Sequence, residues 1–513
     1  MDSRPNPTLN QPADPSLIND DIAPTPASGR TWSVMNMAAL WIGMVVCVPT
    51  YMLAGGLVQI GMNWWQAVLT ISLGNIIVLV PMILNGHPGT KYGIPFPVLS
   101  RASFGIYGAN IAAVMRGLVA CGWFGIQTWI GGAAMYQLLI ALWGSGIGGE
   151  ALPFLGINLL QLGCFLVFWF LQVVIIWRGI ESIKLLETWA APLLILMGLA
   201  LFGWAYVEVG DLGTMLAAST ELAEVSESEV SFWMIFFPSL TAMVGFWATL
   251  SLNIPDFTRY AKTQRDQILG QAIGLPTFMT LFSFIGVAVT SATIVIFGEP
   301  IFDPTELVGK MGGGISIIIA LIALVIATLS TNIAANVVSP ANAIINLRPS
   351  KFSFRMGGMV TAGLGIAIFP WKLLETAGNY IFVWLMGYSA LLGAIGGILI
   401  IDYYLIRKRE LNLDALYQKT GEYWYTGGYN LIAMAALLAG ILPCVPGFLV
   451  EAGFVGEDLV PQFFQSLYTY AWFFSFAMAG GLYYLVTRFG PGSATPDNAS
   501  SAAEPESSEM GEP

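Results

Sequence analysis

A tryptophan and a glutamine stand one helical turn apart within an otherwise apolar run. Trp123 and Gln127 both belong to the stretch from Gly117 to Gly132. A separation of four residues places the two side chains on one face of a helix. An amide in a hydrophobic membrane segment is costly unless a partner satisfies its donor and its acceptor. An indole beside an amide therefore suits a flat, neutral ligand that forms hydrogen bonds.

Two further polar clusters interrupt apolar runs. The second of them, at residues 330–336, carries hydroxyls and amides that could hydrogen-bond between membrane helices or could line a binding site. Asn332 and Asn336 share a helix face in either case. The hydroxyls of Ser330 and Thr331 are hard oxygen donors, and together with carbonyl groups of an unwound helix they could bind Na⁺. The clusters are Phe246, Trp247 and Thr249, and then Ser330, Thr331, Asn332 and Asn336.

The elements that must position these groups are membrane helices. Of the 513 residues, 56% are hydrophobic and only 10% are charged, whereas soluble domains carry about 25% charged residues. The composition therefore predicts an all-α polytopic membrane protein. Apolar runs of about 20 residues occur twelve times. Their approximate limits are 34–57, 65–85, 109–142, 157–178, 188–208, 232–254, 270–298, 314–337, 356–374, 378–402, 428–449 and 466–487.

The distribution of charge predicts the orientation. With both termini in the cytoplasm, only Lys310 and Lys372 of the 20 Lys and Arg residues lie outside, as the positive-inside rule requires. The net charge is −11, and most of the acidic residues that produce it fall in tails and loops, where they are solvated. The expected segments are disordered cytoplasmic tails at 1–30 and 490–513, five spans in 31–210, five in 211–410 and two in 411–489.

Residues for enzymatic or metal chemistry are scarce. The four cysteines all fall inside or at the edge of apolar runs, without the spacing of a metal site or a disulfide framework. The only histidine, His87, follows the second span beside Pro88, where a structural role in a loop is expected. No charged residue lies in the middle of a span, and Arg116 comes closest. We therefore expect no enzyme, no organic cofactor and a neutral ligand.

Two spans contain glycine and proline at corresponding places. The first is residues 41–51, in span one, and the second is residues 244–255, in span six. Paired broken helices mark the midplane binding site of transporters that are built from inverted repeats. The pattern predicts that both helices are interrupted and that the breaks expose backbone carbonyls to a cation.

Six motifs are spread along the chain: NGHPGTKYGIPFP at 85–97, RASFGIYGAN at 101–110, GWFGIQTW at 122–129, NIPDFTRY at 253–260, STNIAANVVSP at 330–340 and DYYLIRKR at 402–409. Each motif alone is weak, but the set is specific. Over residues 28–490 the chain thereby resembles the nucleobase–cation symporter 1 family, which includes hydantoin, allantoin, uracil and cytosine permeases.

The resemblance implies a five-plus-five inverted repeat (LeuT-like) with two extra C-terminal helices. It implies that Trp123 and Trp247 sandwich a substrate ring, while Gln127 and Asn336 hydrogen-bond its edge. Two departures stand out. Cys47 stands where relatives often carry Gln or Asn, and Phe246 stands where some relatives carry a small residue, which predicts a narrower pocket. The implied Na⁺ ligands are the carbonyls of Gly43, Val46 and Ala327 and the hydroxyls of Ser330 and Thr331.

These observations together predict a symporter that imports a neutral nucleobase or related ring through the cytoplasmic membrane. Uracil, allantoin, hydantoin, cytosine and purines all suit the site, and Na⁺ is favoured over H⁺ as the coupling ion. Nucleic acid is not an expected partner. Gates are expected near Phe382 and Trp384. Two alternatives are a transporter of the same fold for another small solute, such as an amino acid, and a membrane sensor that binds a ligand without transporting it.

Overall fold

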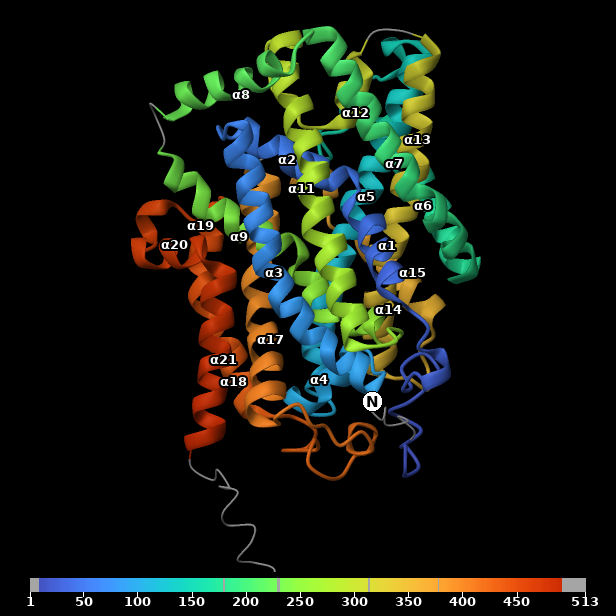
Figure 1. Ribbon diagram of the computed structural model, residues 1–513, viewed down its shortest axis with the longest axis vertical. Helices are drawn as coiled ribbons and strands as arrows, with labels where there is room; N and C mark the ends of the chain where they lie inside the picture. Colours follow the sequence, from blue (N-terminus) through green and yellow to red (C-terminus); the bar gives the residue numbers. More distant parts are fainter. Residues whose placement is uncertain (1–8, 179, 228–230, 312–313, 377, 491–513) are drawn as a thin grey trace, which may run out of the picture.

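The computed structural model describes residues 9–178, 180–227, 231–311, 314–376 and 378–490. Regular structure in this part of the chain is entirely helical, as predicted. Figure 1 shows that most of the long helices run along one axis of a bundle, whereas α8 lies across one end of it. From residue 9 on, the N-terminal segment lies at the opposite end of the bundle, the end at which α21 finishes.

The helices up to residue 209 are α1 (Val34–Val45), α2 (Val48–Gln59), α3 (Trp64–Tyr92), α4 (Phe96–Phe104), α5 (Ala109–Trp143), α6 (Leu159–Arg178) and α7 (Ile180–Val209). The next are α8 (Leu212–Glu227), α9 (Phe232–Asn253), α10 (Pro255–Thr258), α11 (Gln264–Phe297), α12 (Pro304–Lys310), α13 (Gly314–Asn336), α14 (Val338–Leu347), α15 (Phe354–Ala367), α16 (Pro370–Leu373), the π-helix η3 (Asn379–Leu385), α17 (Ser389–Ile401) and the π-helix η4 (Asp402–Ile406). The last are α18 (Leu431–Ile441), α19 (Val445–Glu451), α20 (Gln462–Thr469) and α21 (Ala471–Phe489).

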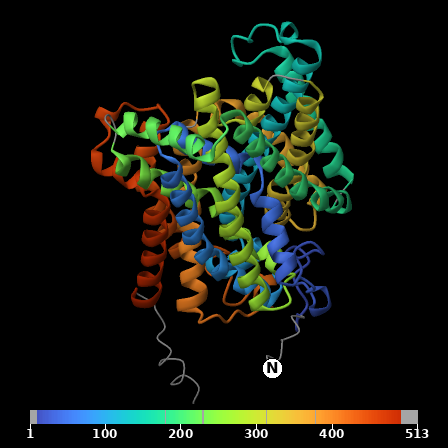
Figure 2. The same ribbon diagram turned by 45° about the horizontal axis from the view of Figure 1, so that its top comes forward.

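Within the described ranges, nine helices are long and apolar enough to cross a membrane, or ten when the bent pair α1 and α2 counts as one span. The expected ninth span corresponds to the shorter α15 and α16, and the expected twelfth to α21. The helix α5 is central, since it contacts α6, α13, α14 and α15. In the view of Figure 2, the segment between α5 and α6 projects from the bundle at the end away from the termini.

The predicted break in span one is present. The helices α1 and α2 are bent by 57° around Val46 and Cys47. Pro49 explains the break, because it has no N–H to donate to the carbonyl of Val45 and its ring would crowd that carbonyl. The N–H of Cys47 donates to the Val45 carbonyl instead, at 2.9 Å.

The predicted break in span six is wrong. The helix α9 continues from Phe232 to Asn253, through Gly245 and the aromatic pair that follows it. It ends at Ile254, where Pro255 begins the single turn of α10. Gly245 remains helical because a glycine keeps its backbone N–H and therefore leaves the helical hydrogen bonds intact.

The N-terminal tail is also not disordered over residues 9–30. We call residues 9–33 the N-terminal strap. Its side chains of Leu17 and Ile22 are buried in a cluster with Tyr417 and other residues near the termini. The N–H of Thr25 donates to the carbonyl of Gly93 at 2.8 Å. Residues 1–8 and 491–513 lie outside the described ranges.

The helix α3 shows how local sequence sets the ends of an element. Asn63 and Gln66 form a capping box, in which each side chain accepts a hydrogen bond from the other's backbone N–H at 3.0 Å. The helix ends at Gly93, whose φ of 72° lies in the left-handed region that favours glycine. His87 lies within this helix and not in a loop, and its Nδ1 is 2.9 Å from the hydroxyl of Tyr403.

Candidate substrate and cation site

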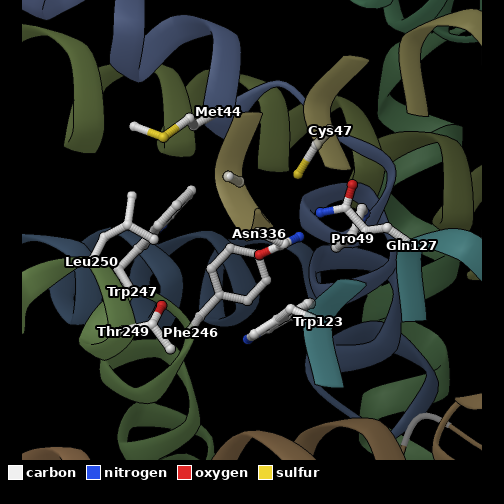
Figure 3. A pocket seen from close by; sticks show the side chains of 11 residues that line it. Met44, Cys47, Pro49, Trp123, Gln127, Phe246, Trp247, Thr249, Leu250 and Asn336 are labelled. Carbon is white, nitrogen blue, oxygen red and sulfur yellow. The ribbon is translucent and has the colours of Figure 1, made fainter. Parts of the chain in front are cut away.

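All six residues expected to contact a substrate line one cavity of about 30 Å³. The break between α1 and α2, the middle of α5, the C-terminal part of α9 and the end of α13 supply the walls (Figure 3). The cavity has room for roughly one or two water molecules, so a ring enters only when side chains move apart. The lining residues are Met44, Cys47, Pro49, Trp123, Gln127, Phe246, Trp247, Thr249, Leu250, Ala335 and Asn336.

Phe246 fills the space between the two tryptophans. Its ring centroid lies 5.2 Å from that of Trp123 and 5.0 Å from that of Trp247, and both contacts are edge-to-face. Figure 3 shows the phenyl ring between the two indoles. The narrow pocket expected from Phe246 is therefore present, and the two tryptophans do not face each other across an open slot.

One hydrogen bond and several ring contacts orient Trp123. Its indole Nε1 donates to the hydroxyl of Tyr388 at 3.3 Å. The ring of Trp384, in η3, packs edge-on against Trp123 with centroids 6.0 Å apart. Tyr380, in the same π-helix, contacts Trp123 at 6.2 Å and donates its hydroxyl to the carbonyl of Pro49 at 3.2 Å. The region expected to carry a gate thus lies against the candidate substrate site.

Polar atoms at the cavity lack partners within the described residues. The Oε1 atom of Gln127 and the indole Nε1 of Trp247 are both buried without a hydrogen bond. A buried polar atom without a partner costs about 1–3 kcal/mol. A ligand that supplies one donor and one acceptor at this place would remove that cost.

Asn336 belongs to a network that connects α5, α6 and α13. Its Nδ2 donates to the Oδ1 of Asn332 at 2.9 Å. The Nδ2 of Asn332 donates to the carbonyl of Phe124 at 2.9 Å and to the Oε1 of Gln172 at 2.7 Å. The sequence left two roles open for these asparagines, and the structure divides them: Asn332 joins helices, whereas Asn336 lines the cavity.

The expected cation ligands lie on α1 and α13, two helices that contact each other. The break leaves the carbonyls of Gly43 and Val46 without a backbone hydrogen bond in the described structure, because the N–H groups of Cys47 and Thr50 donate elsewhere. On α13, the hydroxyl of Ser330 is buried and has no hydrogen-bond partner among the described residues. The other two expected ligands, the hydroxyl of Thr331 and the carbonyl of Ala327, bond to each other. Thr331 Oγ1 donates to the Ala327 carbonyl at 3.0 Å.

A buried arginine supports the cavity wall from the side of the termini. Arg116 donates its Nε to the carbonyl of Thr249 at 3.3 Å and its Nη2 to the Oδ1 of Asn253 at 2.8 Å. Beyond it, burial raises the pKa of the Asp256 carboxyl, whereas the N–H of Phe96 and the charge of Arg116 lower it. The sequence marked Arg116 only by its position near the start of the third span, and gave no signal for Tyr388.

Carboxylate, imidazole and thiolate ligands for a metal are not assembled anywhere in the described ranges. No group of three or more His, Cys, Asp or Glu side chains is placed to hold a metal ion there. All four cysteines are buried and free. The chemistry of the cavity is therefore that of aromatic rings, amides, hydroxyls and backbone carbonyls.

Comparison with known proteins identifies the family. A family profile described as permeases for cytosine/purines, uracil, thiamine and allantoin matches residues 24–474. The chain belongs to this permease family. It is 51% identical to the purine-uracil permease NCS1 of Arabidopsis thaliana over 475 residues, which cover 92% of this chain and 78% of the relative. It is 42% identical to the allantoin permease of Bacillus subtilis, with 93% and 94% of the two chains covered.

The fold of this permease is that of Mhp1, a nucleobase-cation-symport-1 family transporter. The structure of Mhp1 in a closed conformation with bromovinylhydantoin bound matches it with a TM-score of 0.70 and 25% identity. The match covers 93% of this chain and 96% of Mhp1. The expected LeuT-like architecture is thereby confirmed, and the chain is a multi-pass membrane permease and not an enzyme.

Proposed function

We propose that this permease is a secondary symporter that imports a neutral nucleobase or a related ring, such as uracil, allantoin, hydantoin, cytosine or a purine. One observation carries the proposal: Trp123, Trp247, Gln127 and Asn336 line a single cavity beside a broken helix. Stacking on an aromatic side chain contributes about 1–3 kcal/mol per base and tolerates many rings. A side-chain amide adds discrimination, because it pairs with a lactam edge through two hydrogen bonds.

Relatives support this class of substrate. Two of them are a purine-uracil permease and an allantoin permease, and Mhp1 was solved with bromovinylhydantoin bound. The positions of the basic residues support a cytoplasmic location for both termini. Import through the plasma membrane would then carry the ring from the α8 end of the bundle to the end that holds the N-terminal strap.

Sodium is the favoured coupling ion. Among the described residues, the carbonyls of Gly43 and Val46 and the hydroxyl of Ser330 have no hydrogen-bond partner, and they are oxygen ligands at the end of α1 and on α13, two helices in contact. Ala327 and Thr331 would complete the oxygen set after Thr331 releases the carbonyl that it now contacts. Coupling follows if Na⁺ and the ring both bind one conformation more tightly than the other.

Uptake by purified protein in liposomes tests the proposal. We expect saturable uptake of a labelled ring, with uracil, allantoin and hydantoin as the first three probes. Gln127→Ala should reduce it at least about tenfold, because the variant removes both hydrogen-bonding groups from the ring edge. Unchanged uptake in this variant would remove Gln127 from the site. Saturable uptake of a labelled amino acid, with no uptake of any of the three rings, would point to another solute.

The same liposomes test the cation. An inward Na⁺ gradient should accelerate uptake, and the Ser330→Ala/Thr331→Ala double variant should lose that acceleration while it still binds the ring. Thr361 provides a control, because its hydroxyl lies on α15 and donates within its own helix. The Thr361→Val variant should keep the Na⁺ effect. Uptake that follows an imposed pH gradient and ignores Na⁺ would overturn the choice of sodium.

A further inference from the structure

We propose that Asn332 is a positioning residue that fixes which end of the Asn336 amide faces the substrate. The inference rests on the proposed function and deepens it, because it names a feature that the transported ring must have. Asn332 itself does not line the cavity. It is fully buried, and it acts through its neighbour one helical turn along α13.

The orientation of Asn332 is set by a group that cannot change its role. Its Nδ2 lies 2.9 Å from the carbonyl oxygen of Phe124. A backbone carbonyl can only accept a hydrogen bond, so the atom that faces it must be the nitrogen of the amide. The contact with the Oε1 of Gln172 at 2.7 Å is compatible with that assignment. The nitrogen of Asn332 is thereby committed to α5 and α6.

Because its nitrogen is committed, Asn332 presents its oxygen to Asn336. The atom of Asn336 that faces this oxygen at 2.9 Å must be a donor, and hence its Nδ2. A side-chain amide has only one other end, so the Oδ1 of Asn336 is left for the cavity. Reversal of the Asn336 amide would place two oxygens against each other in a buried site, which costs free energy.

Gln127 has no comparable constraint. Neither end of its amide has a hydrogen-bond partner among the described residues, and its Oε1 is buried. It lies across the cavity from α9 (Figure 3). Its amide can therefore turn either end toward a ligand. The two amides of the site differ in character: Asn336 is a fixed acceptor, and Gln127 adapts.

The structure thus assigns a requirement to the substrate. A transported ring must direct a hydrogen-bond donor, such as the N–H of a lactam, an imide or a ureide, at Asn336. A ring that directs an acceptor there would leave two oxygens unpaired in a buried site. Sites built around such a hydrogen bond discriminate strongly against ligands that cannot form it.

Uracil and 1,3-dimethyluracil are suitable probes, because they share one ring and the same carbonyl acceptors, and only uracil has N–H donors to direct at Asn336. We would measure their dissociation constants by tryptophan quenching with the full-length protein. The wild type should distinguish the two rings by at least about tenfold. Asn332→Leu releases the Asn336 amide, so the ratio of the two constants should fall to within about threefold while uracil still binds.

A matched variant separates polarity from packing. Asn332→Asp has the same shape, and in the neutral form that burial favours, its hydroxyl donates to the Phe124 carbonyl while its other oxygen accepts from Asn336. It should therefore retain the wild-type ratio. Thr128→Val is a second control, because it removes a hydroxyl 3.3 Å from Asn332 and leaves the Phe124 carbonyl in place. It should retain the ratio as well.

The outcomes distinguish the two proposals. A wild-type ratio that persists in Asn332→Leu would overturn the role of Asn332, and so would equal binding of both rings to the wild type. If Asn332→Leu does not fold, Asn336→Leu removes the acceptor directly and must also abolish the discrimination; otherwise the inference fails. If neither ring quenches the fluorescence of the wild type, the proposed ring transport and the inference both fall.

Discussion

Phe246 decides how much space the candidate site offers. It contacts Trp123 and Trp247 at once, so the aromatic surfaces that could stack on a ring now stack on a side chain. Each such edge-to-face pair contributes about 0.5–1.5 kcal/mol beyond its burial. A substrate must replace these contacts with its own, and a ring of similar size does so at little cost. The residue is therefore a candidate determinant of substrate size.

Removing this ring should shift selectivity towards larger substrates. We expect Phe246→Ala to raise the affinity for a bicyclic purine relative to uracil by about tenfold, because the vacated volume lies between two aromatic faces. Competition against the uptake of a labelled ring measures the ratio. Phe202→Ala is the control, since Phe202 packs against Phe284 in another part of the bundle. An unchanged ratio in Phe246→Ala would show that Phe246 does not limit the size of the ring.

At the scale of elements, a π-helix lies against the central helix of the site. The helix η3 carries Trp384, whose ring rests on α5 at Gly122. A Cβ atom at this glycine would overlap the indole, so the close approach requires a residue without a side chain. Trp384 also contacts Trp123. The packing of η3 on α5 thus covers one side of the candidate substrate site, where the sequence predicted a gate.

Gly122→Ala should separate binding from transport. The added methyl would hold Trp384 off α5 and disfavour the conformation described here by about 1–3 kcal/mol. We expect the initial rate of uptake to fall about tenfold or more, while uracil binding measured by tryptophan quenching changes only a few-fold. Gly117→Ala is a matched control on the same helix, because its Cβ would meet Ala343 at an ordinary 3.4 Å. Equal rates in the two variants would contradict a gating role for η3.

At the scale of the whole molecule, the sequence grouped the residues that line the cavity better than it predicted the contacts that support them. Helical spacing grouped Trp123 with Gln127, and the cavity contains both. Pro49 predicted a break because a proline removes a backbone donor. The prediction of a break at Gly245 was wrong, because glycine alone does not interrupt a helix. Pro255, the proline of the same motif, lies where α9 has already ended.

The remaining features depend on contacts between distant segments, which a single sequence does not reveal. Gln172 is 160 residues from Asn332 along the chain, and nothing in the local pattern pairs them. The N-terminal strap has a polar composition that is typical of disorder. Its two buried hydrophobic residues, Leu17 and Ile22, are too few to form a periodic pattern, and they become ordered only against a surface that the folded bundle supplies.

The strap joins parts of the molecule that are far apart in sequence. Arg259, which follows α10, donates its Nε to the hydroxyl of Thr25 at 2.8 Å. Tyr417, beyond η4, donates its hydroxyl to the carbonyl of Ile22 at 2.8 Å, and Arg101 of α4 donates to the carbonyl of Leu17 at 3.0 Å. The strap thereby ties together three segments that are distant in sequence, at the end of the bundle where α21 ends.

These contacts predict a contribution to global stability from a segment outside the membrane spans. Ile22 is fully buried, and truncation of a buried isoleucine to alanine costs about 2–5 kcal/mol. We expect Ile22→Ala to lower the midpoint of thermal unfolding of the purified protein. Ile18→Ala should lower it much less, because Ile18 is only half-buried on the same strap. Equal midpoints for both variants and the wild type would mean that the bundle is as stable without the strap as with it. A selective loss in Ile22→Ala would instead show that the folded unit begins well before the first span, because a side chain contributes to stability only where the segment that carries it is ordered.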